Sequence, residues 1–242
     1  MPPVLIITHG QPSDPAPSAQ ELARLAMRVA HLLPNRQIGS VTLAEPGGLA
    51  REVARLGTGG LAYPLFMAGG WFTRLHLPAR LQEAGAVGWQ VLEPMGCDPA
   101  VHQLAIAIVK EAIAKTTVPP AEMTLVLAAH GSFRSSVPSD IARHLVAKIM
   151  AATGLGRAEA AFIDQSPRIA DLPPLGVNSL CLPFFASAGG HVIEDIPNAL
   201  QAARFTGRLL PALGLDRRIP GVIAQAIDAE QSVCATECRY RV

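Results

Sequence analysis

Two histidines and an aspartate in the second half of the chain each follow an apolar run with the composition of a buried strand. His130 follows LVLAA, Asp164 follows EAAFI, and His191 comes shortly after LPFF. Neutral imidazoles and a carboxylate suit a divalent first-row ion such as Co²⁺, Fe²⁺, Ni²⁺ or Zn²⁺, and leave coordination positions open for a substrate. We therefore predict these three residues as catalytic groups and metal ligands, with purely structural hydrogen bonding as the alternative for either histidine alone.

Two further carboxylates follow His191 at the expected start of a helix. Glu194 and Asp195 would complement the positive end of the helix dipole there. Alternatively, one of them takes up protons or steers cations toward the histidines. Both interpretations stay open.

The elements that position these residues come from an internal duplication. VLIITHGQPS at 4–13 matches LVLAAHGSFR at 125–134, and YPLFMAGGWFTRLHLP at 63–78 matches LPFFASAGGHVIEDIP at 182–197. Such repetition at a nearly constant offset indicates two tandem copies. We expect an N-terminal lobe at 1–119, a C-terminal lobe at 120–233 and a tail at 234–242.

Apolar runs alternate with segments of helical period in each copy, which predicts a parallel sheet covered on both faces. In the second copy we expect strands near 124–129, 158–163, 178–184 and 207–211, and helices near 138–153, 166–172, 192–204 and 217–229. The fold class is α/β, with two tandem doubly wound lobes. Because ligands bind outside the carboxyl ends of parallel strands, His130, Asp164 and His191 should meet at one edge of the second sheet.

The composition excludes several classes of protein. Half of the 242 residues are hydrophobic, 16% are charged and the formal net charge is +1, so we expect a globular chain without a nucleic-acid partner. Pro and Gly break the apolar stretches before they reach the length of a membrane span, and the N-terminus lacks the pattern of a secretory signal. We expect no membrane association, a cytoplasmic location, and a monomer or homodimer.

The four cysteines do not form the framework of a disulfide-rich chain. Cys97 and Cys181 are expected to be small buried residues. Cys234 and Cys238, four residues apart, either bind a metal or a cluster or have no such role.

A histidine phosphatase is a weak alternative, since that class uses a histidine after the first strand. Its motif is Arg-His-Gly, however, and Thr8 and Ala129 occupy the arginine position here. Arg134 could still bind an anion.

The segments AAHGS, AFIDQSP, LPFFASAGGHVIEDIP and LPALGLD resemble, in this order, the class II tetrapyrrole chelatases, especially the sirohydrochlorin cobaltochelatases and ferrochelatases. The resemblance covers nearly the whole chain through the duplication. It implies a two-lobed chelatase fold with the macrocycle between the lobes. The family's two histidines and acidic residue fall on His130, His191 and Asp164; the family usually has Glu at the last position, so Glu159 is the fallback.

The first copy keeps His9 and Glu45 but has Phe72 in place of His191, so it resembles a degenerate partner lobe. Trp71 and Phe72 either stack on the macrocycle or fill a core. Arg134, Arg168 and Arg74 are candidate contacts for substrate carboxylates. The predicted substrate-binding residues are Arg134, Ser132, Gly190, Trp71, Phe72 and Glu194.

The expected activity is ATP-independent insertion of Co²⁺ or Fe²⁺ into sirohydrochlorin or a related carboxylate-rich tetrapyrrole, for cobalamin or sirohaem synthesis. The metal is a substrate, and no tightly bound cofactor is expected. A metal or tetrapyrrole carrier without turnover is the alternative from a different functional class. Activity of the purified protein separates the two.

Overall fold

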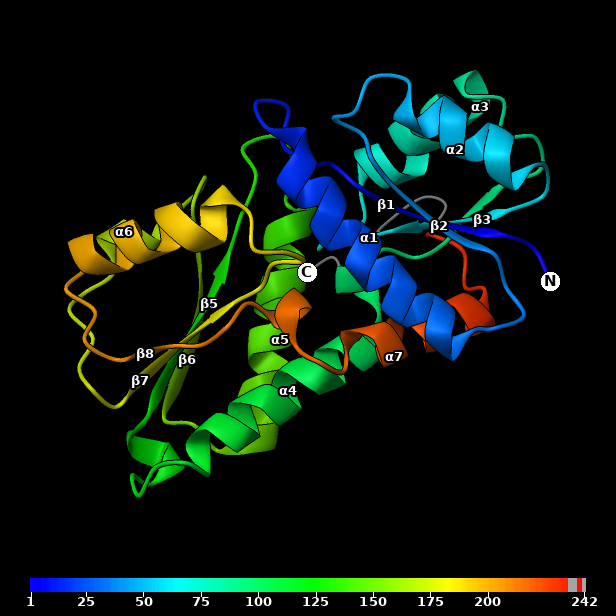
Figure 1. The fold of residues 1–242 in the computed structure, drawn as a ribbon. Coiled ribbons are helices and arrows are strands. Elements are labelled where there is room, and N and C mark those ends of the chain that lie inside the picture. The colour runs from blue at the N-terminus through cyan, green and yellow to red at the C-terminus, as the bar shows by residue number, and fades with distance from the viewer. Residues whose placement is uncertain (235–238, 241–242) are drawn as a thin grey trace. The chain divides into compact units, whose positions relative to one another are not determined.

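The structure, a computed structural model, describes residues 1–234 and 239–240 (Figure 1). These residues form two compact units. The first unit contains Met1–Asp98 together with the described residues from Arg217 to Cys234, and the second contains Pro99–Asp216 together with Arg239 and Tyr240.

The first unit is built on a four-stranded parallel sheet of order β2-β1-β3-β4. Its strands are β1 (Val4–Thr8), β2 (Ile38–Thr42), β3 (Leu61–Pro64) and β4 (Gln90–Val91). Its helices are α1 (Pro15–Leu32), α2 (Gly48–Leu56), α3 (Leu77–Glu83) and α7 (Ile219–Ala229).

The second unit repeats this topology with the order β6-β5-β7-β8, also parallel. Its strands are β5 (Thr124–Ala129), β6 (Arg157–Phe162), β7 (Ser179–Pro183) and β8 (Arg208–Leu209). Its helices are α4 (Pro99–Ile113), α5 (Val137–Thr153) and α6 (Ile196–Ala202). The two sheets confirm the predicted fold class and the duplication.

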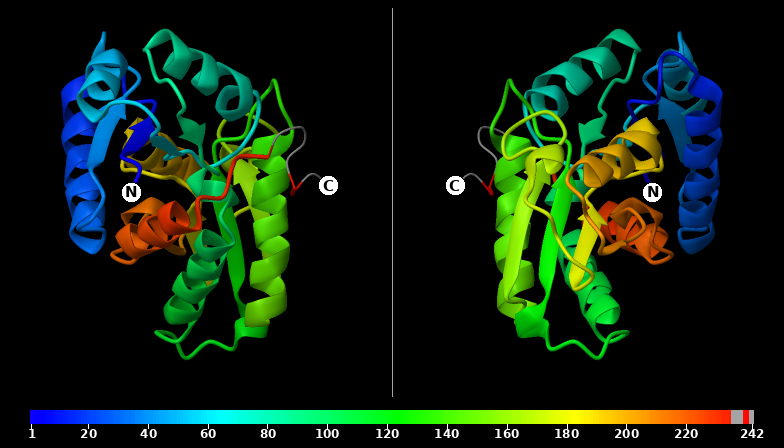
Figure 2. Two further views of the ribbon diagram at one scale, coloured as in Figure 1. Left: turned by 90° about the vertical axis from the view of Figure 1, so that its right-hand side faces the viewer. Right: turned by 90° about the vertical axis from the view of Figure 1, so that its left-hand side faces the viewer.

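Helices cover both faces of each sheet, which explains why the central strands are apolar without alternation. In the first unit, buried side chains of α2 and α3 pack on one face of the sheet, and α1 lies beside α7 (Figure 2). In the second unit, α6 packs on one face and α5, with α4 beside it, covers the other (Figure 1).

The compact units differ from the predicted lobes of 1–119 and 120–233 in their last helices. Helix α4 ends the first repeat but packs beside α5 in the second unit, while α7 ends the second repeat and packs beside α1 in the first. Each sequence repeat therefore contributes one helix to the other unit. Val101, Leu104 and Val109 give α4 the buried apolar face that this packing requires.

The prediction of a helix near 166–172 is wrong. Only a 3₁₀ turn forms there, at Ile169–Asp171, although the first repeat has the full helix α2 at the corresponding place. Leu172 has φ −63° and ψ 146°. It precedes Pro173, and a residue before proline is pushed out of the α region, so the turn cannot continue into a helix.

No helix within residues 1–234 and 239–240 is long and apolar enough to cross a membrane.

Candidate active site

His130 leaves the end of β5 through a turn that only glycine fits. Gly131 has φ +75°, and a Cβ atom there would lie 2.7 Å from the Gln165 side chain. The Gln165 side-chain oxygen accepts a hydrogen bond of 2.7 Å from the main-chain N–H of Ser132. The loop after β6 thus fixes the loop that carries His130.

Asp164 follows β6 and extends its pairing with β5. Its main-chain N–H donates to the His130 carbonyl at 3.0 Å, so the two residues sit side by side at the carboxyl ends of neighbouring strands. The distance from Asp164 Oδ2 to His130 Nδ1 is 3.4 Å. The predicted meeting of these two side chains is therefore present in the structure.

The loop that leads from β7 to His191 is held by a close approach to the 3₁₀ turn at Leu213–Leu215. Gly214 N–H donates to the Phe185 carbonyl at 2.8 Å. A Cβ atom on Gly214 would lie 2.0 Å from the Ala186 carbonyl oxygen, so only glycine permits this contact.

His191 begins a π turn, His191–Asp195, that runs directly into α6. The Ile196 N–H bonds to the His191 carbonyl five residues back. Pro197 explains the wide turn, because in a regular α-helix its ring would clash with the carbonyl four residues earlier. Single π turns are frequent at functional sites. This one places Asp195 on the same side as His191, with 2.6 Å between Asp195 Oδ2 and His191 Nδ1.

The two imidazoles meet edge to face, with ring centroids 4.7 Å apart and an interplanar angle of 88°. Phe185 lies near the His191 ring, with centroids 6.2 Å apart. The side chains of His130, Asp164, His191 and Asp195 are 46%, 41%, 47% and 51% exposed. A ligand can therefore reach both rings from solvent.

The partners of the two rings define which nitrogen carries the proton. His130 Nδ1 lies 3.0 Å from the Gly131 carbonyl oxygen, which can only accept a hydrogen bond. His191 Nδ1 faces a carboxylate oxygen, also an acceptor. In the neutral rings Nδ1 therefore holds the hydrogen, and the lone pair is on Nε2. Both histidines are prepared to accept a proton or bind a metal through Nε2.

Among the described residues, no three His, Cys, Asp or Glu side chains form a group that could hold a metal ion. The predicted site residues instead form two His–carboxylate pairs whose rings are in contact. The role of His130, His191 and Asp164 as metal ligands stays a prediction.

The other predicted residues of the second unit lie within a few residues of these pairs in the sequence. Ser132 Oγ accepts a hydrogen bond of 3.1 Å from the Arg134 main-chain N–H, and the Arg134 and Glu194 side chains are exposed. Gly190 directly precedes the π turn. Glu159, the fallback for Asp164, lies inside β6 and pairs with Arg157 at 2.8 Å, whereas Asp164 follows the carboxyl end of that strand.

The first unit has an aromatic cluster where the second has its histidine pair. His9 packs against Phe66 and Phe72, each with ring centroids 4.5 Å away. Phe72 begins a second π turn, Phe72–His76, in which His76 takes the place of Asp195. Exposed Trp71 stacks on His76, with centroids 5.1 Å apart and an angle of 20°.

In the first unit, Ala44 occupies the position that Asp164 has in the second. Ala44 N–H donates to the His9 carbonyl at 2.9 Å, as Asp164 N–H does to His130, so Ala44 is the structural equivalent. Glu45, the residue expected there, is shifted by one position and pairs with Arg51.

The sequence named Asp195 only as an alternative to Glu194, and it did not indicate Gln165. Asp195 was weighed only together with Glu194, although its spacing of four residues from His191 places two side chains on one side of a helical turn. The contact of Gln165 with Ser132 has no signal in the sequence.

The described cysteines lie outside this site. Cys97 and Cys181 are buried, as predicted, and burial raises the pKa of Cys181 to about 12. Cys234 Sγ lies 3.8 Å from Glu93 Oε1. Cys238, the second member of the predicted pair, lies outside the described residues.

The chain resembles two structures of SirB: one from Bacillus subtilis with Fe³⁺ (15% identity, 95% of this chain and 96% of that chain, TM-score 0.71) and one from Bacillus subtilis subspecies spizizenii, described as a sirohydrochlorin chelatase in complex with cobalt (14%, 95% and 95%, 0.66). At these identities the similarity establishes the two-lobed chelatase fold.

A more similar structure is that of CbiX, described as the terminal enzyme for biosynthesis of siroheme in denitrifying bacteria. It shares 43% identity over 95% of this chain and 100% of that chain, with a TM-score of 0.87. The CbiX family model matches residues 124–230. A comparison with curated proteins gave no match. The chain belongs to the CbiX family.

Proposed function

We infer that this protein is an ATP-independent chelatase that inserts Co²⁺ or Fe²⁺ into sirohydrochlorin or a related carboxylate-rich tetrapyrrole. Membership of the CbiX family and the identity of 43% to a terminal enzyme of siroheme biosynthesis support this activity. The product would serve sirohaem or cobalamin synthesis.

One observation carries the proposal: two half-exposed imidazoles are in contact, and the Nδ1 atom of each faces a carboxylate. The family model matches residues 124–230, which contain both histidines. We place the active centre in the second unit for these reasons.

Metal insertion requires the loss of two protons from pyrrole nitrogens as the ion enters the ring. Nε2 of His130 and Nε2 of His191 each have the lone pair needed to accept one of them. Asp164 and Asp195 then stabilise the protonated rings, and exchange with solvent returns both protons to water. In the neutral state the Gly131 carbonyl and the Asp195 carboxylate accept hydrogen bonds from Nδ1 of His130 and His191, and so orient the two rings.

The metal is a substrate that must leave the protein for the macrocycle. A site with few protein ligands can hold the ion briefly and still release it. His130, His191 and Asp164 are the ligands we propose for this transient contact, which must end before the Nε2 atoms can accept the pyrrole protons. The exposure of all three side chains, between 41% and 47%, leaves positions for the tetrapyrrole nitrogens.

The substrate-binding residues extend the proposal to the periphery of the ring. Arg134 offers a guanidinium to a carboxylate. Ser132 lies in the loop that follows His130, and Gly190 directly precedes His191. Glu194, next to Asp195 in the π turn, is a further proposed contact. Trp71 and Phe72 belong to the first unit and stay predictions as substrate-binding residues.

Anaerobic absorbance spectroscopy of sirohydrochlorin with Co²⁺ or Fe²⁺ tests the function. We expect the wild-type protein to accelerate spectral conversion over the protein-free reaction, and His191→Ala to remove the acceleration while its circular dichroism spectrum stays unchanged. Wild-type rates equal to the protein-free rates with both metals would refute a chelatase and favour a carrier.

A further inference from the structure

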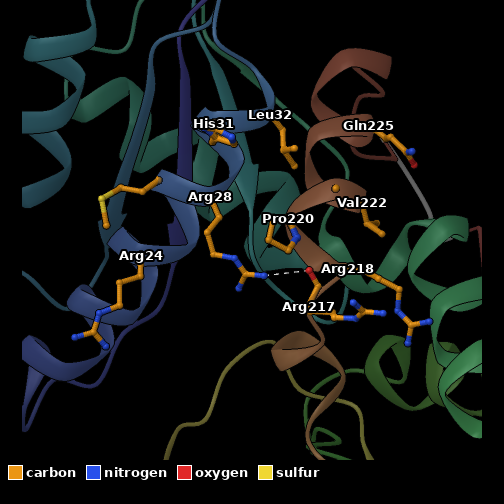
Figure 3. A pocket seen from close by; sticks show the side chains of 11 residues that line it. Arg24, Arg28, His31, Leu32, Arg217, Arg218, Pro220, Val222 and Gln225 are labelled. Carbon is orange, nitrogen blue, oxygen red and sulfur yellow. Dashed lines mark hydrogen bonds between the residues drawn. The ribbon is translucent and has the colours of Figure 1, made fainter. Parts of the chain in front are cut away.

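A wide groove on the first unit, between α1 and the start of α7, is lined by cationic side chains (Figure 3). Its volume is about 910 Å³. Because α1 connects two parallel strands, it runs antiparallel to them. The groove therefore lies toward the amino ends of the strands, away from the edge of this sheet that carries His9.

Two arginines and a histidine form a row on α1. Arg24, Arg28 and His31 occupy positions i, i+4 and i+7 and are all exposed, so they share one face over about 10 Å of the helix axis. Arg217 and Arg218, just before α7, also line the groove, and in Figure 3 their side chains extend away from α1. None of the eleven described residues that line the groove is acidic.

The Arg28 charge is available to a ligand. In Figure 3 the Arg28 side chain reaches from α1 toward α7 and donates one hydrogen bond, of 3.0 Å, to the Arg217 carbonyl oxygen. This bond fixes the position of the Arg28 guanidinium and leaves its other N–H groups available to bind a ligand. Within residues 1–234 and 239–240, neither Arg24 nor Arg28 nor Arg217 forms an ion pair with a carboxylate.

Apolar surface lies between the cations. Met27 and Leu32 on α1 are 65% and 49% exposed, and Pro220 and Val222 line the opposite side. Ligand sites combine a largely apolar lining with a few placed polar groups. A guanidinium can also stack on a flat π-system while it binds carboxylates. The groove thus suits a large, flat organic molecule that carries several carboxylates along its edge.

We propose that this groove is a second, non-catalytic binding site for a carboxylate-rich tetrapyrrole. The choice of ligand rests on the proposed function, which supplies a molecule of this class. The macrocycle lies against Met27, Leu32 and Val222, and its peripheral carboxylates contact Arg24, Arg28 and His31. The protein then binds two rings per chain, one of them outside the insertion site.

Titration with uroporphyrin, a stable carboxylate-rich porphyrin, tests the proposal without metal, at fixed ionic strength. We expect two rings per wild-type chain and one ring per chain for Arg24→Glu/Arg28→Glu. The matched control Lys110→Glu/Lys115→Glu makes the same change in charge at two exposed positions and should keep both rings. The milder Arg28→Gln should weaken the groove site about tenfold.

Three results would overturn the second site: one ring per wild-type chain, two rings retained by the Arg24→Glu/Arg28→Glu variant, or an equal loss in the lysine control. Displacement of the groove ring by ATP would assign the groove to a phosphate ligand and overturn the proposal as well. Because the titration contains no metal, its result stays interpretable even if the protein does not insert metal in the activity assay. Conversely, if the protein inserts metal but binds only one ring per chain, the second site is refuted and the proposed function is not.

The rate of metal insertion at saturating substrate should be the same for wild type and Arg24→Glu/Arg28→Glu. A loss of that rate would place the groove in the insertion step and contradict a non-catalytic site.

Discussion

Replacing Asp195 with asparagine should slow metal insertion by about tenfold without unfolding the protein. The carboxylate lies 2.6 Å from His191 Nδ1, and both side chains are about half exposed. At that distance a water-like dielectric leaves about 1 to 2 kcal/mol of attraction to a protonated ring. Asparagine can still accept the hydrogen bond from Nδ1, so the neutral ring keeps its orientation and only the charge is lost. A difference of 1.4 kcal/mol corresponds to about tenfold in rate.

The assay compares kcat and KM for cobalt insertion in wild type, Asp195→Asn and Glu194→Gln. Glu194→Gln removes the same charge from the same π turn, at an exposed side chain that has no hydrogen bond to His191. Because Glu194 is a proposed substrate contact, we expect any loss in Glu194→Gln to appear in KM, whereas the loss in Asp195→Asn should fall on kcat. Equal losses of kcat in the two variants would show that the turn acts only through its net charge and would refute the His191–Asp195 pair.

Three further predictions concern the supports of the site and its surroundings. Gly214→Ala should lower Tm by about 6 to 10 °C in a calorimetric scan, because its Cβ would lie 2.0 Å from the Ala186 carbonyl oxygen, whereas Gly221→Ala, with nothing within 4 Å, should leave Tm nearly unchanged. Gln165→Ala should reduce insertion severalfold through loss of the 2.7 Å bond that anchors the His130 loop; unchanged kcat would contradict that role. Cys181, with a pKa of about 12, should resist iodoacetamide at pH 8 until denaturant is added, and mass spectrometry would detect any earlier alkylation.

The architecture was predictable because the sequence contains two copies of the same pattern. Apolar strands bounded by Gly, Pro and His recur at a nearly constant offset, and parallel topology follows from the alternation with helices. The carboxyl ends of the strands then had to bring His130, Asp164 and His191 to one edge, and the structure places His130 near both of the others.

The exchange of α4 and α7 was not predictable from the repeats. A helix with an apolar face buries a similar area against either sheet. The order of the two copies along the chain therefore does not show whether the last helix of a copy packs in the unit formed by that copy or in the other unit. The prediction that Glu45 is the equivalent of Asp164 was wrong for a related reason. The offset between copies changes from 121 at His9 to 119 further on, and the sequence does not reveal where the register shifts.

The pairing of His191 with Asp195 depends on a π turn. A regular helix starting near residue 192 leaves Glu194 and Asp195 equally placed, and only the wide turn required before Pro197 selects Asp195. The equivalent turn before Pro78 holds Phe72 and His76 instead, so the same backbone supports an aromatic cluster in one unit and a candidate catalytic pair in the other.

The location of the active centre is tested most directly by comparing His191→Ala with His9→Ala in the anaerobic insertion assay, with folding of both variants checked by circular dichroism. We expect His191→Ala to abolish insertion, whereas His9→Ala, which removes a ring packed against Phe66 and Phe72, should have a much smaller effect. Equal loss in both variants, or a greater loss in His9→Ala, would contradict an active centre in the second unit.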